Sequence, residues 1–220
     1  MKVLFVVQGN DFWNPLGLMQ VAAIAKQRGD KTYLAVLPND NILDKIEKIK
    51  PDVVAYGSSS HEHKDYLMIN QKVKSKYKHI FTIMGGSHPT FFPEVINEGN
   101  LDAVCIGEGE LAFAELLKRL EKGEDVSSLK NIVVKGGKFN GLYPLIQDLD
   151  SLPFPDRELF YENSRILGKE NSPAMNFITS RGCPFNCTYC FNHALRDMYQ
   201  GQKFIRRRSV DNVLQEVEET

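Results

Sequence analysis

Short apolar runs alternate with segments of helical period through the first 125 residues, and this alternation restricts the fold more than any other feature of the sequence. Between the runs, apolar residues recur every three or four positions, as at Ile42, Ile46 and Ile49. Apolar strands that alternate with amphipathic helices form a parallel sheet covered by crossover helices. We therefore predict an α/β fold, with a flavodoxin-like (Rossmann-like) five-stranded parallel sheet in residues 1–125. The predicted strands are residues 2–7, 32–37, 52–56, 80–84 and 102–106.

Turn-forming residues follow four of these predicted strands. They are Gly9-Asn10 and the clusters at residues 57–60, 85–88 and 107–109. The carboxyl ends of parallel strands share one edge of a sheet, and ligands bind at that edge where the strand order reverses. Glycine at such an edge lets the backbone approach a ligand closely. The sequence therefore predicts a ligand pocket at the carboxyl edge of the sheet.

A different pattern follows residue 125. Residues 126–172 are expected to form a small hairpin that turns at Gly136-Gly137, and then an extended interdomain linker restricted by Pro153 and Pro155. We expect residues 173–220 to begin a second domain, with a strand over residues 174–179 and a helix over residues 211–219.

The charge balance gives no general reason to expect a polyanionic partner or a membrane surface. The 27 basic and 28 acidic residues leave a formal charge of −1, and no apolar run approaches the ~18 residues of a spanning helix. We predict a cytoplasmic protein without a membrane partner. Residues 203–208 form the one basic run, which we interpret as a solvated face, so a nucleic-acid partner is not expected.

Three of the four cysteines lie within eight residues, at Cys183, Cys187 and Cys190. Soft thiolate ligands suit iron–sulfur clusters and zinc. A [4Fe–4S] cluster held by three cysteines keeps one iron open, whereas a zinc site would need a fourth ligand such as His193. Unligated cysteines are the third interpretation of this spacing. Cys105 lies in an apolar run and is expected in the core.

The cysteine segment at residues 181–190, which includes Arg181-Gly182-Cys183-Pro184, resembles the cluster loop of radical S-adenosylmethionine enzymes. The resemblance implies that the three cysteines hold a [4Fe–4S] cluster whose fourth iron binds S-adenosylmethionine. It also implies that Tyr189 lies near the adenine, that residues 174–179 are the first strand of a β/α barrel, and that a reductant such as flavodoxin or ferredoxin supplies electrons.

Residues 14–18, 85–90 and 102–110 resemble the cobalamin-binding domain that precedes the barrel in one branch of this family, and residues 152–157 are similar to its linker. Small side chains at the strand ends would let the nucleotide tail of cobalamin pass the sheet, and Glu108 could bond a polar group at the rim. The residues expected to contact cofactor are Asn10, Leu16, Gly17, Ser58, Ser59, Ser60, Gly85, Gly86, Ser87, Gly107, Glu108 and Tyr189.

The first loop departs from the pattern of many cobalamin proteins, in which a histidine of an Asp-x-His-x-x-Gly motif ligates cobalt. Residues 9–17 contain no histidine, so we expect cobalt without a histidine ligand from this loop. His61, His63 and His88 are the remaining candidates, although a loop histidine is more often solvated or hydrogen-bonded.

These resemblances imply a cobalamin-dependent radical S-adenosylmethionine enzyme that transfers a methyl group to an unactivated carbon through methylcobalamin and a 5′-deoxyadenosyl radical. Ring-forming or rearranging chemistry is the first alternative, and a non-catalytic corrinoid-binding or zinc-binding module is the second. The 47 residues from Ala174 to Thr220 suffice for the first barrel unit, so we expect a truncated barrel and an inactive chain. We expect the substrate to be a small molecule or a peptide.

Overall fold

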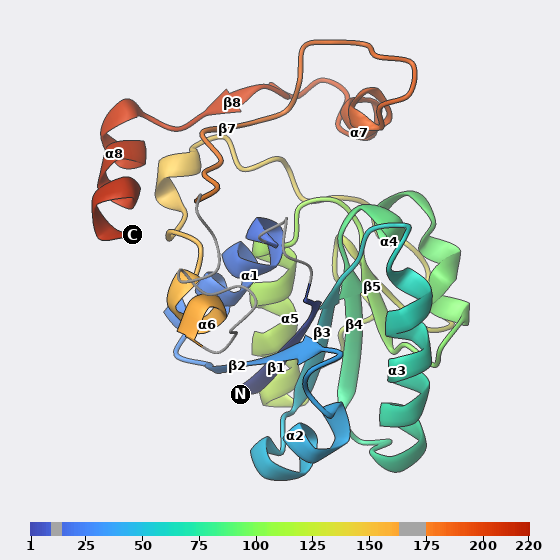
Figure 1. Cartoon of the computed structure of the whole chain (residues 1–220). Helices are drawn as coiled ribbons and strands as arrows, with labels where there is room; N and C mark the ends of the chain where they lie inside the picture. Colours follow the sequence, from blue (N-terminus) through green and yellow to red (C-terminus); the bar gives the residue numbers. More distant parts are fainter. Residues whose placement is uncertain (10–14, 163–174) are drawn as a thin grey trace.

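A six-stranded sheet lies at the centre of the protein, in a computed structural model that describes residues 1–9, 15–162 and 175–220 (Figure 1). The strand order is β2-β1-β3-β4-β5-β6, in which β1 to β5 are parallel and β6 is antiparallel to β5. The strands are β1 (Lys2–Gln8), β2 (Lys31–Leu37), β3 (Val53–Gly57), β4 (Phe81–Gly85), β5 (Ala103–Cys105) and β6 (Ile132–Val134). The predicted five parallel strands are confirmed, and a sixth strand extends the sheet.

Helices cover both faces of this sheet. One face packs against α1 (Leu16–Gln27), α5 (Glu110–Lys122) and α6 (Arg157–Glu162), and the other packs against α2 (Ile42–Ile49), α3 (His63–Lys76) and the 3-10 helix η1 (Pro93–Asn97). Side chains alternate between the faces of a strand, so Phe5 and Val7 join the first cluster while Leu4 and Val6 join the second. The continuous apolar runs thus reflect burial on both faces.

Local signals in the sequence set the helix boundaries. The side chain of Asn41 accepts a hydrogen bond from the Leu43 amide (3.1 Å) and caps α2. Gly123 ends α5 at a φ of 68°, a left-handed conformation that favours glycine.

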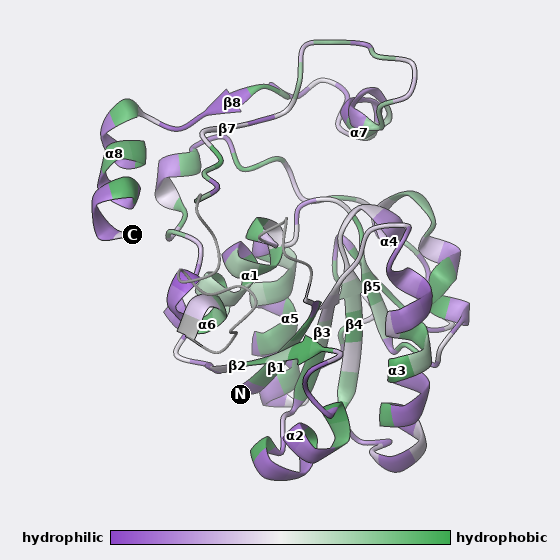
Figure 2. Cartoon of the chain, viewed as in Figure 1, coloured by the Kyte–Doolittle hydropathy of each residue, from purple (hydrophilic) through white to green (hydrophobic). Residues whose placement is uncertain are grey.

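Hydrophobic residues concentrate in the central strands (Figure 2). Among the described residues no helix is long and apolar enough to cross a membrane.

Two predictions for the second half of the chain are wrong. Residues 132–134 do not form a hairpin with the segment after Gly137; they pair with β5, where Cys105 faces Ile132. The sheet edge at β5 offers free ladder groups, so this pairing satisfies the strand. Of the strand predicted over residues 174–179, residue 174 lies outside the described residues, and residues 175–179 have no regular secondary structure; the strand here is β7 (Ser180–Arg181). β7 pairs antiparallel with β8 (Arg206–Arg207), not with a parallel neighbour.

The proline-containing linker is packed against the first helix. The Gln20 side chain donates to the Pro153 carbonyl (2.6 Å), and the Asp156 amide donates to the Met19 carbonyl (3.0 Å). These contacts seat the linker, including the 3-10 helix η2 (Leu149–Ser151), beside α1. The segment that follows contains β7, α7 (Asn192–Met198), β8 and α8 (Val210–Glu219), and Figure 1 shows it at the upper end of the molecule.

Candidate functional site

A cavity of about 930 Å³ lies at the carboxyl edge of the sheet. The ends of β1, β3, β4 and β5 form its floor, and β1 lies between β2 and β3, where the strand order reverses. Its other walls come from the linker and from the cysteine segment, including Leu152, Phe154, Phe191, Leu195 and Tyr199. The cavity thus lies where an open parallel sheet binds ligands.

Most residues expected to contact cofactor border this cavity. Those in its wall are Leu16, Gly17, Ser58, Ser59, Gly85, Gly86, Ser87, Gly107 and Glu108. Ser60 is not among the lining residues; its hydroxyl instead bonds the Nδ1 atom of His88 (3.1 Å). Tyr189 also lies outside the wall and is 91% exposed. Asn10 lies outside the described residues.

Gly86 allows the loops after β3 and β4 to interlock. Its φ is 101°, and a Cβ atom there would lie 2.5 Å from the Ser58 carbonyl oxygen. The Ser58 amide donates to the Gly85 carbonyl (2.8 Å), and the His88 amide donates to the Ser58 carbonyl (3.1 Å). These contacts require glycine at position 86 whether or not a ligand is present.

The cysteine loop presents three thiols that are not in disulfides. Cys187 is exposed, while Cys183 and Cys190 are half-buried. The Cys190 amide donates to the Cys187 carbonyl (3.0 Å), and the Asn192 side chain donates to the Cys190 Sγ atom (3.3 Å). Within the described ranges, no three His, Cys, Asp or Glu side chains are gathered around one metal position. The three soft donors suit an iron–sulfur cluster in kind.

Cys105 belongs to the floor of the cavity and to the core, as predicted. Burial, together with the negative charge of Glu110, raises the pKa of its thiol to about 12. The thiol is therefore neutral at physiological pH and acts as a small apolar group in the cavity floor.

Of the three histidines considered as cobalt ligands, His61 borders the cavity. Its Nδ1 atom lies 3.2 Å from the Ser59 hydroxyl. His63 and His88 lie outside the cavity wall and stack on each other with ring centroids 3.8 Å apart. Burial and the neighbouring His63 lower the pKa of His88. The structure therefore leaves His61 as the candidate at the cavity.

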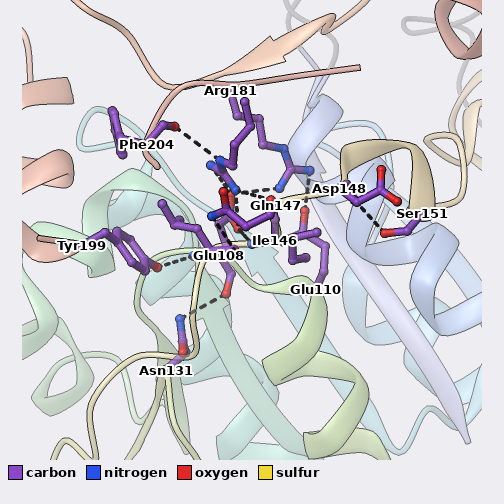
Figure 3. A network of polar contacts seen from close by, with 12 residues as sticks. Glu108, Glu110, Asn131, Ile146, Gln147, Asp148, Ser151, Arg181, Tyr199 and Phe204 are labelled. Atoms are coloured by element: carbon purple, nitrogen blue, oxygen red, sulfur yellow. Dashed lines mark hydrogen bonds and ion pairs between the residues drawn. The ribbon is translucent and has the colours of Figure 1, made fainter. Parts of the chain in front are cut away.

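A partly buried ion-pair network joins the β5–α5 loop to both sides of the cysteine loop. Figure 3 shows Glu108 and Glu110 facing Arg181. Arg181 Nη1 lies 3.2 Å from Glu108 Oε1, and its Nη2 lies 2.6 Å from Glu110 Oε1. Arg206 Nη2 lies 2.8 Å from Glu108 Oε1, and the Tyr199 hydroxyl accepts a hydrogen bond from the Glu108 amide (3.1 Å). We call Glu108, Glu110, Arg181, Tyr199 and Arg206 the Glu108 junction.

The electrostatics of this junction favour the ionised carboxylate. Burial alone would raise the pKa of Glu108, but the hydrogen bond from Arg206 and the charges of Arg181 and Arg206 outweigh it and hold the pKa below its usual value.

The interpretation of the basic run as a solvated face is wrong for two of its arginines. Arg206 is 3% exposed and pairs with Glu108, and Arg208 pairs with the buried Glu216. Arg207 between them is exposed, because neighbouring strand residues point to opposite sides. Glu108 lies in the β5–α5 loop, 98 residues from Arg206, and Glu216 lies in α8 outside the basic run, so the basic run by itself carried no signal for these ion pairs.

Comparison with known proteins decides the family. Residues 2–117, more than half of the chain, match the model of the B12 binding domain. The chain belongs to the B12-binding domain family. An uncharacterized methyltransferase of Pyrococcus horikoshii is 33% identical over 215 residues, which cover 92% of this chain and 45% of the relative. The cobalamin-dependent radical SAM methyltransferase TokK of Streptomyces tokunonensis is 27% identical over 205 residues, which cover 86% of this chain and 30% of the relative.

The fold of nearly the whole chain recurs in a solved structure. The radical S-adenosylmethionine methyltransferase TsrM from Kitasatospora setae matches 99% of this B12-binding chain and 45% of its own, with a TM-score of 0.72 and 14% identity. The suspected family, radical S-adenosylmethionine enzymes that carry a cobalamin-binding domain, is confirmed, and so is the Rossmann-like fold. The chain spans less than half the length of the relatives it matches.

Proposed function

We propose that this chain forms the cofactor-binding portion of a cobalamin-dependent radical S-adenosylmethionine methyltransferase. Cobalamin would occupy the cavity, and a [4Fe–4S] cluster with S-adenosylmethionine would occupy the cysteine loop. The observation that carries the proposal is the composition of the cavity wall, because the B12-binding sheet edge and the segments on either side of the cysteine loop line the same space. Two cofactors held in this way could act on one substrate.

The side chains of the cavity wall suit a corrinoid in their chemistry. Apolar side chains such as Leu16, Val21 and Phe154 offer a surface for a broad ring, while Ser58 and Gly86 leave a passage of small residues for a nucleotide tail. A cavity of about 930 Å³ lies near the upper end of the roughly 300–1,000 Å³ range of ligand pockets. Residues 9–17, which follow β1, contain no histidine. His61 is therefore the candidate ligand to cobalt among the described residues that line the cavity.

The residues around the cysteine loop would limit access of water. Phe191, Leu195 and Phe204 present apolar surface to the cavity beside the loop. When bound and reduced, the cluster would supply the one electron that cleaves a carbon–sulfur bond of S-adenosylmethionine to give methionine and a 5′-deoxyadenosyl radical, and methylcobalamin would supply the methyl group. A reactive radical requires exclusion of water and of bystander groups. A flavodoxin or ferredoxin as reductant and a reducing compartment such as the cytoplasm belong to the same proposal.

Methyl transfer is preferred because the relative at 33% identity is named as a methyltransferase. Ring formation stays the first alternative, because three anaerobic magnesium-protoporphyrin IX monomethyl ester cyclases match at 24–28% identity. A non-catalytic corrinoid-binding module is the alternative of a different class. Because the matched part is less than half of these relatives, we propose that methyl transfer requires more than these 220 residues.

Metal analysis after anaerobic reconstitution tests the proposal. We expect one cobalamin and four irons per chain, with the absorption of an iron–sulfur cluster. Cys183→Ala, Cys187→Ala and Cys190→Ala together should remove the iron and keep the cobalamin. Cys105→Ala is the matched control for the iron, because it removes a buried cysteine outside the loop and should keep the cluster. Cobalt without iron in the wild-type protein would favour a corrinoid-binding module, and zinc alone would favour a zinc-binding module.

A further inference from the structure

The β5–α5 loop contacts the chain both before and after the cysteine loop. Arg181 stands two residues before Cys183, whereas Tyr199 ends α7 and Arg206 lies in β8. All three contact Glu108, through its carboxylate or its amide. A single residue of the B12-binding domain therefore holds both ends of the segment that carries the three cysteines.

The carboxylate of Glu108 has no hydrogen-bonding capacity left for a ligand. Its Oε1 atom meets Arg181 (3.2 Å) and Arg206 (2.8 Å), and its Oε2 atom accepts from Arg206 Nη1 (3.0 Å) and from the Ile146 amide (3.1 Å). A carboxylate offers about four acceptor positions. Glu108 borders the cavity, but its polar atoms are directed to the protein and not to a cofactor.

The backbone beside Glu108 is shaped for the same contact. A Cβ atom at Gly107 would overlap the hydroxyl of Tyr199, so glycine at this position lets the tyrosine reach the loop. Tyr199 and Arg206 are both buried. Loss of its partner Glu108 would be strongly unfavourable for the buried charge of Arg206, and this favours the arrangement of the Glu108 junction that the structure shows.

We propose that Glu108 is a positioning residue that couples occupation of the cavity to the order of the cysteine segment. A ligand that packs against the cavity wall fixes the β5–α5 loop, and the carboxylate transmits this constraint to Arg181 and Arg206. By linkage, an ordered cysteine segment tightens binding in the cavity by the same factor. This inference rests on the proposed binding of cobalamin in the cavity.

Amide hydrogen exchange of the full 220-residue chain, with and without hydroxocobalamin, tests this coupling. In the wild-type protein hydroxocobalamin should slow exchange at the cavity edge, in residues 57–60 and 85–88, and also in residues 180–208. The expected slowing in the cysteine segment is about 5–150-fold, the usual range of coupling between two sites. In Glu108→Gln the edge protection should remain, and the slowing in residues 180–208 should fall below about twofold.

Glu115→Gln is the matched control. It makes the same chemical change on α5, where Glu115 pairs with Lys118 and Arg119 outside the junction, and it should transmit protection as the wild type does. Arg181→Lys is a second test, because one ammonium group cannot bridge Glu108 and Glu110 as the guanidinium does. Full protection of residues 180–208 in either folded variant would overturn the proposal.

The wild-type experiment separates the two levels of inference. Binding of hydroxocobalamin with protection confined to the cavity edge would overturn the coupling alone. No binding to the wild-type protein would overturn the proposed function, and the coupling with it.

Discussion

Replacement of Gly86 by alanine should destabilise the fold and deform the cavity at the same time. The φ and ψ of Gly86 are 101° and −169°, a region that essentially only glycine adopts, and another residue there costs about 1–3 kcal/mol. The new Cβ atom would lie 2.5 Å from the Ser58 carbonyl oxygen and 2.9 Å from its amide nitrogen. Relief of these contacts requires movement of the Ser58 loop and weakens two backbone hydrogen bonds of about 1 kcal/mol each. We expect a loss of about 3–5 kcal/mol in the free energy of unfolding.

Urea unfolding followed by circular dichroism measures this loss. Gly17→Ala is the matched control, because Gly17 also borders the cavity but, apart from its chain neighbours and its own helix, no described atom lies within 4 Å of its Cβ position. Gly17 lies within α1, where alanine is favoured over glycine by up to about 1 kcal/mol, so this variant should be as stable as the wild type or more so. A loss below about 1 kcal/mol for Gly86→Ala would refute the assigned role of this glycine.

Three further outcomes follow from the same geometry. Arg206→Met should cost about 3–5 kcal/mol of unfolding free energy, because it removes a buried partner of Glu108. Arg207→Met should change the unfolding free energy by less than about 0.5 kcal/mol, because Arg207 is exposed. Equal effects of the two substitutions would contradict the assignment of Arg206 to the Glu108 junction. The pKa of Glu108 is lowered in the folded protein, so its ionised carboxylate should contribute fully to stability above the ordinary pKa of about 4.3. This contribution should be lost as the pH falls through the lowered value. The difference in unfolding free energy between wild type and Glu108→Gln, measured across pH, should therefore shrink only as the pH falls. Iodoacetamide at pH 8 should modify the exposed Cys187 and spare Cys105, whose thiol is buried with a pKa of about 12; peptide mass spectrometry showing equal modification would be inconsistent with this burial.

The parallel sheet could be predicted from the sequence because each strand is buried on both faces. Burial on both faces produces a short apolar run between amphipathic helices, as in residues 2–7, and this pattern is visible in the local sequence. The sequence of β6 does not indicate the strand with which it pairs. Its three residues could pair with a following segment or with the free edge of β5, and only the packed structure distinguishes the two.

The sequence predicted the location of the candidate site but not the structural role of each residue in it. Clusters of glycine and serine marked the carboxyl edge, but the sequence did not reveal that Gly86 accommodates Ser58 or that Glu108 is saturated by protein partners. The Glu108–Arg206 pair joins residues 98 positions apart. Contacts of this kind depend on how the segments fold back on each other, and periodicity carries no signal for them.

Binding of hydroxocobalamin to the wild-type protein and to Gly17→Trp tests the central claim most directly. The side chain added at Gly17 has open space at its Cβ position, so the variant should fold, and its indole should occupy the cavity. We expect one hydroxocobalamin per wild-type chain by absorption titration, and a dissociation constant at least about tenfold higher in Gly17→Trp, with an unchanged circular dichroism spectrum. No binding by the wild type, or equal affinity in the folded variant, would contradict the claim that this cavity holds cobalamin.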